Sequence, residues 1–202
     1  EKAMGSNRSE RMGSREGLAG LIDTLRYHEA SRQGLGLILL LVCAWFTMPA
    51  GGGRIVTGFV IAALGQAWRI YAAGVIYKNK RLATTGAYSL VRHPLYFGNF
   101  LILAGFTLAC ANWIVVAVVV FFLLFYYPAA IRYEDRKLQD LFGEEWQAWG
   151  TRTPAMFPTR LRWQSNEDSE WNGRQSMIRN GELVYTLFEI GAAVLLWYRA
   201  AA

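Results

Sequence analysis

The chain has 202 residues, of which 53% are hydrophobic, 14% are aromatic and only 18% are charged. This apolar content is high for a soluble domain, and the length suits a single domain. The sequence contains no P-loop and no G-x-G-x-x-G motif, which excludes a soluble nucleotide-binding domain. The composition therefore predicts an all-α, polytopic integral membrane protein.

Residues 1–33 form a polar N-terminal segment. Between Glu16 and Arg32, apolar residues recur on one helical face, which is typical of a helix lying along the membrane interface; these residues are Leu18, Leu21, Ile22 and Leu25. A juxtamembrane lead-in to the first crossing fits the same residues. Because this polar segment precedes the first apolar run, we expect no cleaved signal peptide.

Five long apolar runs follow, at residues 34–50, 55–77, 95–111, 113–131 and 183–198. Each comes near the roughly 20 residues that a helix needs to cross about 30 Å of hydrocarbon. We therefore expect about five transmembrane helices. They divide into a membrane core over residues 34–182 and an additional C-terminal transmembrane helix within 183–202.

The cations predict the orientation in the membrane. Eighteen of the 21 Lys and Arg residues fall in the N-terminal segment or in the polar loops 78–94 and 132–182, whereas only Arg54 and Arg199 fall on the other side. By the positive-inside rule, the N-terminus and both loops face the cytoplasm and the C-terminus lies on the opposite side. Topology and anionic lipid account for the net charge of +6, so we expect the bilayer as a partner and no nucleic acid.

The cysteines and histidines do not indicate a metal site. Cys43 and Cys110 sit in separate apolar runs without C-x-x-C spacing, so we expect both to be structural. His28 and His93 are the only histidines and are far apart in the sequence.

Polar residues that could take part in binding or catalysis gather at the cytoplasmic ends of the third and fourth apolar runs. The connection between these runs is only Ala111–Asn112–Trp113, so the runs must form an antiparallel hairpin. The hairpin brings two polar clusters together at the cytoplasmic side, namely Arg92, His93 and Tyr96 from one run and Arg132, Glu134 and Asp135 from the other. Aromatic rings, cations and carboxylates together suit S-adenosylmethionine, but they also suit other anionic nucleotides.

Three further features of the sequence lead to predictions. Arg69 lies at membrane depth, where a cation usually faces a polar cavity; pairing with Gln66 or a carbonyl would also explain it. After the fourth run, apolar residues keep helical spacing up to an interruption at Gly143. Beyond it, we expect Trp146 and Trp149 to be interfacial anchors, and Glu144 and Glu145 to be solvated.

The ordered set of motifs resembles the isoprenylcysteine carboxyl methyltransferase family and, more loosely, the integral-membrane phospholipid methyltransferases. The resemblance rests on LATTGAYSLVRHPLYFGNF, on YEDRKLQDLFGEEWQAW after the hairpin, and on GQAWRIYAAG in the second run, and covers about residues 60–158. It implies S-adenosylmethionine as cofactor, in a cytoplasmic pocket formed by the loop before the third run and the helix after the fourth.

The resemblance also implies roles for individual residues. Arg81, Leu82 and Ala83 would approach the cofactor through their backbone, and Tyr88 would line the pocket. The residues expected to bind the cofactor directly are His93, Pro94, Leu95, Tyr96, Glu134 and Asp135, with Asp135 standing where the family has a second Glu. Arg92, His93 and Arg132 are the candidate catalytic residues. We expect His93 to act first as a ligand to the cofactor, and a role as a base stays open.

The methyl acceptor is expected to be a lipophilic molecule or a lipid, with Arg69 and Arg132 as candidate substrate residues. Isoprenylcysteine members of the family carry a substrate-binding Arg four residues before the first Glu, where this chain has Ala130. An isoprenylcysteine, a phospholipid amine, a thiol and another isoprenoid acid all stay open as acceptors. The alternative functions are an NADPH-dependent membrane reductase of the sterol-reductase type and a non-enzymatic membrane adaptor. The oligomeric state is not predicted.

Overall fold

The computed structural model describes residues 29–77, 80–159, 163–165 and 170–201. These residues form helices joined by loops, without a strand among them. The predicted interfacial helix within 16–32 lies almost entirely outside the described residues. The helical elements are α2 (Glu29–Trp45), α3 (Gly52–Val75), α4 (Ala87–Leu90), α5 (Pro94–Cys110), α6 (Trp113–Gly150), the π-helical turn η1 (Gln175–Arg179) and α7 (Glu182–Ala201).

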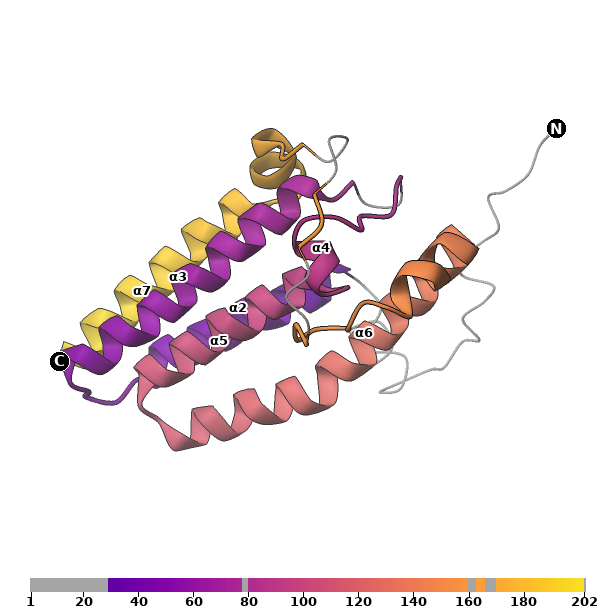
Figure 1. The fold of residues 1–202 in the computed structure, drawn as a ribbon. Helices are drawn as coiled ribbons and strands as arrows, with labels where there is room; N and C mark the ends of the chain where they lie inside the picture. The colour runs from indigo at the N-terminus through magenta and orange to yellow at the C-terminus, as the bar shows by residue number, and fades with distance from the viewer. Residues whose placement is uncertain (1–28, 78–79, 160–162, 166–169, 202) are drawn as a thin grey trace.

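The long helices form a bundle with one divergent member (Figure 1). Helices α3 and α7 run side by side, with α2 and α5 next to them, and the core between these helices includes Phe106, Leu103 and Leu196. Helix α6 starts from the tight connection to α5 and extends beyond the bundle at the end where α4 lies. Cys43 and Cys110 are both free and fully buried in this core.

Three helices are long and apolar enough to cross a membrane, namely α3, α6 and α7. Helices α2 and α5 carry shorter apolar segments, at Gly34–Trp45 and Pro94–Cys110. The all-helical membrane architecture is therefore confirmed, and the count of five crossings stays a prediction.

Local sequence signals explain the hairpin and the course of α6. Pro94 occupies the start of α5, where its missing N–H costs no hydrogen bond. Asn112 caps α6 by accepting hydrogen bonds from the backbone N–H groups of Ile114 and Val115, at 3.0 and 3.4 Å. Gly143 has φ of 51° inside α6, a conformation that favours glycine. The predicted interruption of this helix at Gly143 is thus confirmed.

Glycines allow α3 and α5 to approach each other closely. A Cβ atom at Gly65 would lie 2.8 Å from the backbone oxygen of Gly98 and 2.8 Å from the Cβ of Leu101. Gly58 on α3 meets Gly105 on α5 in the same way. Small residues at such a crossing are the usual means by which membrane helices pack at short distance. The close crossing holds Arg69 of α3 against the first turns of α5.

We expect Gly65→Ala to lower the free energy of unfolding by about 1–3 kcal/mol, because the added methyl group overpacks a backbone contact that cannot shift without moving α5. Gly191→Ala on α7 is the matched control, since no atom lies within 4 Å of the added Cβ. Unfolding of the purified chain in detergent measures both. Equal stability of the two variants would contradict the close α3–α5 crossing.

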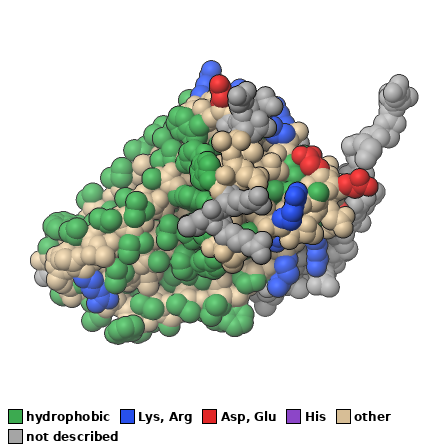
Figure 2. Space-filling model, in the orientation of Figure 1, with side chains coloured by type: hydrophobic (Ala, Val, Ile, Leu, Met, Phe, Trp, Pro, Cys, Tyr) green, Lys and Arg blue, Asp and Glu red, His purple; other side chains and the backbone are tan. Residues whose placement is uncertain are grey.

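Charged side chains gather at one end of the molecule (Figure 2). The long sides of the bundle are mostly apolar on the face shown, while Lys, Arg, Asp and Glu side chains collect where α4 and the C-terminal half of α6 lie. The polar clusters predicted from the sequence fall at this charged end, next to the apolar bundle.

Candidate active site

The start of α5 is fixed by the segment that follows α6. The backbone N–H of Arg92 donates to the carbonyl of Pro154 at 2.8 Å, and that of His93 donates to Ala155 at 2.9 Å. The guanidinium of Arg92 donates to two further carbonyls, of Gly150 at 2.7 Å and Thr153 at 3.0 Å. The chain therefore folds back from the end of α6 and holds the Arg92–His93 dipeptide in one position.

Asp135 connects α6 to the foot of α5. Its Oδ2 accepts a hydrogen bond from Nη2 of Arg92 at 2.8 Å, and its Oδ1 lies 2.9 Å from Nε2 of His93. His93 is only 5% exposed. The structure thus joins two segments that are about forty positions apart in the sequence, as the hairpin argument predicts.

The carboxylate of Asp135 is stabilised in its ionised form. Partial burial acts to raise its pKa, but the hydrogen bond from His93 and the charges of His93 and Arg92 outweigh burial, so the pKa lies below its ordinary value of 3.8. A carboxyl whose pKa is lowered on folding contributes stability above its unfolded pKa and loses it as the pH falls through the lowered value. Asp135 therefore stays charged at neutral pH.

Glu134 and two tyrosines complete the surroundings of His93. Oε2 of Glu134 lies 3.9 Å from Nδ1 of His93, and the Glu134 side chain is one-third exposed. The imidazole meets the ring of Tyr96 edge-on at 5.8 Å between centroids, and Tyr96 meets Tyr127 in the same way at 5.2 Å. His93 thus has a carboxylate near each nitrogen and an aromatic ring beside it.

An aromatic cluster lies next to this group. Tyr88, on α4, packs with Trp149, and Nε1 of Trp149 donates to the carbonyl of Tyr88 at 3.3 Å. Further members at its edge include Leu82, Ala83, Leu95 and Trp146. The prediction that Trp149 is an interfacial anchor is wrong, because the side chain is only 9% exposed. Trp146 also packs inward, and the guanidinium of Arg92 lies 5.8 Å from its ring.

Three buried polar atoms in this region have no hydrogen-bond partner within the described part of the chain. They are the hydroxyl of Tyr88, Nε of Arg92 and Nε1 of Trp146. Burial, assisted by the charge of Glu134, raises the pKa of Tyr88, so its hydroxyl keeps its proton. All three atoms carry hydrogens that can be donated, and burying such groups unpaired costs about 1–3 kcal/mol each. A ligand with several acceptor atoms would pair them.

Residues 51–140 match the model of the isoprenylcysteine carboxyl methyltransferase family. This match covers 90 of the 202 residues, so the chain is similar to this family over slightly less than half of its length. The matched segment runs from α3 into α6 and contains Tyr88, Arg92, His93, Glu134 and Asp135. The resemblance inferred from the motifs is thereby confirmed, and the match supports a membrane enzyme of the methyltransferase class.

Two curated relatives have names that refer to metal resistance. Over 102 residues the chain is 41% identical to the cobalt-zinc-cadmium resistance protein CzcN of Cupriavidus metallidurans and 37% identical to the nickel-cobalt-cadmium resistance protein NccN of Alcaligenes xylosoxydans xylosoxydans. Each match covers 50% of this chain and 46% of the relative, so the chain spans about half the length of the curated relatives it matches. No solved structure shows a significant match. Within the described residues, no group of three or more His, Cys, Asp or Glu side chains could hold a metal ion.

Two arginines of the predicted site are exposed, whereas His93 is buried. Arg132 is exposed on α6 and forms no hydrogen bond or ion pair with the described residues. Arg81 is exposed as well, and its guanidinium lies 4.4 Å from the ring centroid of Tyr77. Pro94 is fully buried, and its carbonyl accepts a hydrogen bond from Trp68 at 3.1 Å.

Arg69 is held by a residue that the sequence did not single out. Its Nη2 lies 2.7 Å from Oε1 of Glu182 and its Nε 3.1 Å from Oε2, while Nη1 donates to Asn99. Both side chains of the ion pair are at least 97% buried. Gln66, the partner expected for Arg69, donates to Glu182 instead, at 3.2 Å. The available signal was an acidic residue directly before the last apolar run, beyond the segment matched by the family.

Proposed function

We propose that the chain transfers a methyl group from S-adenosylmethionine to a lipophilic acceptor at the cytoplasmic face of a membrane. The observation that carries the proposal is the joining of Arg92, His93 and Asp135 beside three unpaired buried donors, within a chain that is similar to a methyltransferase family. The positive-inside distribution of Lys and Arg supports the cytoplasmic placement of this end.

The residues present fit the cofactor that the family implies. S-adenosylmethionine supplies an activated methyl group and carries a carboxylate, ribose hydroxyls and a purine. The unpaired donors of Tyr88, Arg92 and Trp146 would pair acceptor atoms of the carboxylate or purine, and the partly exposed carboxylate of Glu134 would accept the ribose hydroxyls. Leu82, Ala83 and Leu95 pack at the edge of the Tyr88 cluster, which places their backbone near the same region.

The role of His93 follows from its two neighbours. When Nε2–H is donated to Asp135, a neutral imidazole keeps its lone pair on Nδ1, the nitrogen that faces Glu134. A carboxylate acceptor needs no base, whereas a thiol or amine must first lose a proton. Nδ1 of His93 is the atom that would take this proton, and Asp135 positions the ring.

For the methyl acceptor we propose only a chemical class, a lipophilic molecule. The names of the two relatives refer to metal resistance and not to a methyl acceptor. Ala130 is fully buried where isoprenylcysteine members carry an arginine, and residues two apart on a helix point roughly 200° away from each other. Arg132 therefore cannot replace that arginine without a local change in winding. We infer that a free prenylcysteine carboxylate is not the preferred acceptor.

Binding of S-adenosylhomocysteine to purified protein tests the proposal. We expect Glu134→Ala to weaken binding by about 1.5–3 kcal/mol, the usual range for a hydrogen bond to a charged group, which is about 10- to 150-fold in Kd. Glu144→Ala is the matched control, because Glu144 lies on the same helix and is exposed, and it should bind like the wild type. Calorimetric titration measures both variants.

The same titration separates the alternative functions. Binding of NADPH in preference to S-adenosylhomocysteine would favour a membrane reductase, and binding of neither would favour an adaptor. Equal loss of affinity in Glu134→Ala and Glu144→Ala would contradict the role assigned to Glu134.

A further inference from the structure

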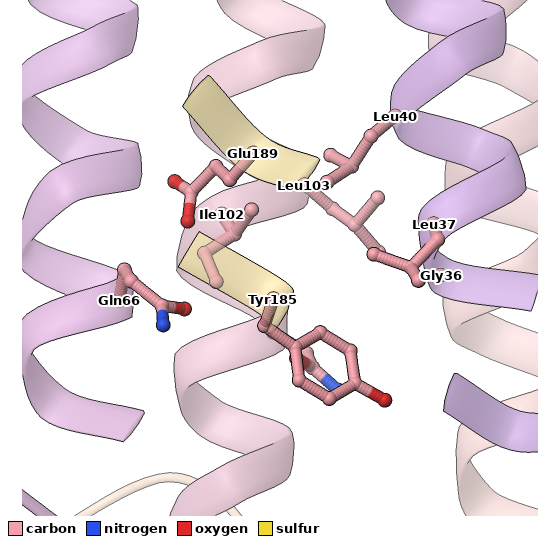
Figure 3. Close-up of a pocket in the computed structure, with 9 residues that line it drawn as sticks. Gly36, Leu37, Leu40, Gln66, Ile102, Leu103, Tyr185 and Glu189 are labelled. Atoms are coloured by element: carbon pink, nitrogen blue, oxygen red, sulfur yellow. The ribbon is translucent and has the colours of Figure 1, made fainter. Parts of the chain in front are cut away.

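A small cavity with a mostly apolar lining and a few polar side chains lies inside the helical bundle, among α2, α3, α5 and α7. It is lined by Gly36, Leu37, Leu40, Gln66, Asn99, Ile102, Leu103, Tyr185 and Glu189. In Figure 3, the side chains of Glu189 and Gln66 lie toward the α3 side of the cavity, and Leu37 and Leu40 lie on the α2 side. None of the residues given a role in the proposed methyl transfer lines this cavity.

The unmatched groups that line the cavity are hydrogen-bond acceptors. Gln66 is 95% buried, and its Nε2 donates to Thr186 at 2.8 Å and to Glu182 at 3.2 Å, which leaves Oε1 without a partner. Glu189 is half-buried and forms no hydrogen bond with the residues that the structure describes. The nearby donors of Arg69 are already taken by Glu182 and Asn99. An occupant that pairs these acceptors must therefore bring its own donors.

The charges around the cavity favour a cation. Glu182 and Glu189 contribute two carboxylates, and Arg69 contributes one guanidinium, which is paired with Glu182. This leaves the carboxyl group of Glu189 without a paired cation in an apolar bundle, where a cation that enters the cavity would favour its ionised form. Ionisable groups at such positions are rare and usually mark a binding site or a pathway.

The size of the cavity limits what can enter. The centre of a water molecule can occupy a volume of about 30 Å³ inside it. This is room for one or two groups of the size of water. A primary ammonium group is about as large as water, whereas a trimethylammonium group is much larger. On the outer faces of α2 and α7, next to the cavity, apolar side chains are exposed, including Ile38, Leu41 and Leu187. These faces can accommodate a hydrocarbon tail.

We propose that this cavity binds the primary ammonium group of an amphiphile, with the ammonium between Glu189 and Oε1 of Gln66 and the tail along α2 and α7. The ammonium supplies three donors and a positive charge, and the cavity supplies acceptors and an unpaired carboxylate. A free long-chain amine and the headgroup of an aminophospholipid share this chemistry.

Titration of the purified full-length chain in detergent tests the proposal with dodecylamine as the probe. We expect saturable binding of dodecylamine, while dodecanol, which controls for partition into the micelle, and dodecyltrimethylammonium, which controls for charge, should bind at least tenfold more weakly. Glu189→Gln should weaken dodecylamine binding at least tenfold. Glu145→Gln, at an exposed position of α6, should leave it unchanged.

A second variant guards against a folding defect. If Glu189→Gln loses its helical circular dichroism, Gln66→Met is measured instead and should also weaken dodecylamine at least tenfold. Wild-type affinity in a folded variant, or dodecanol binding as tightly as dodecylamine, would overturn the proposal. Glu134→Ala should bind dodecylamine normally, so this proposal and the methyltransferase proposal fail separately.

Native mass spectrometry of the chain extracted from membranes separates the two sources. A retained aminophospholipid that dodecylamine displaces identifies a headgroup as the occupant. Binding of dodecylamine to a chain that retains no aminophospholipid identifies a free amine.

Discussion

Replacing Glu182 with alanine is expected to lower the free energy of unfolding by about 3–5 kcal/mol, because it leaves the buried guanidinium of Arg69 without its counter-ion. The two side chains are 3% and 2% exposed and form two short contacts, so the guanidinium of Arg69 is shielded from bulk water. Gln66 also loses an acceptor in this variant. Unfolding of the purified chain in mixed micelles measures the loss, and Glu144→Ala, which changes an exposed carboxylate, should have almost no effect.

A double replacement separates the ion pair from the packing around it. The double variant Arg69→Met/Glu182→Met removes both buried charges. Replacing a buried ion pair with apolar residues often leaves the free energy of unfolding unchanged. We expect the double variant to be more stable than Glu182→Ala. If the double variant loses as much stability as Arg69→Met and Glu182→Met lose when added together, the two side chains are not energetically coupled.

The sequence could predict the parts of the site that are close along the chain or joined by a short turn. The short connection at 111–112 forces α5 and α6 into a hairpin, and this brings His93 and Asp135 to the same end of the two helices. The sequence also predicts the interruption of the helix at Gly143, because a glycine lies within a pattern of helical spacing. Both predictions depend on the local backbone conformation, which the short connection and the glycine restrict strongly.

The parts that could not be predicted depend on how distant helices pack. The partner of Arg69 lies more than a hundred positions away at Glu182, and the pairing requires α7 to lie against α3, which no local pattern specifies. Likewise, Trp149 points inward because the chain continues from Gly143 in a new direction. Before that direction is known, a tryptophan near an apolar run fits a membrane interface equally well.

Asp135→Asn is expected to reduce the rate of methyl transfer about 100-fold, the loss that a displacement of about 1 Å in a reacting group can cause. An amide offers one acceptor oxygen and no charge, so it cannot hold both Arg92 and His93 as the carboxylate does. A transfer assay with a labelled methyl donor and native lipid extract measures the rate. Asp140→Asn is the matched control, because Asp140 lies on the same helix and is exposed.

The conservative variant and the pH dependence distinguish positioning from a general loss of stability. Asp135→Glu restores the residue expected at this position of the family and should keep most of the activity, with a normal fold in circular dichroism. Because the pKa of Asp135 is lowered by His93 and Arg92 despite its burial, the carboxylate stays ionised from pH 5 to pH 8, which lies about one unit or more above its ordinary pKa. Asp135→Asn should therefore lose activity at every pH in this window, because the wild-type carboxylate is charged throughout it. Full wild-type activity of Asp135→Asn at pH 5 would show that the charge of Asp135 does not hold His93 there.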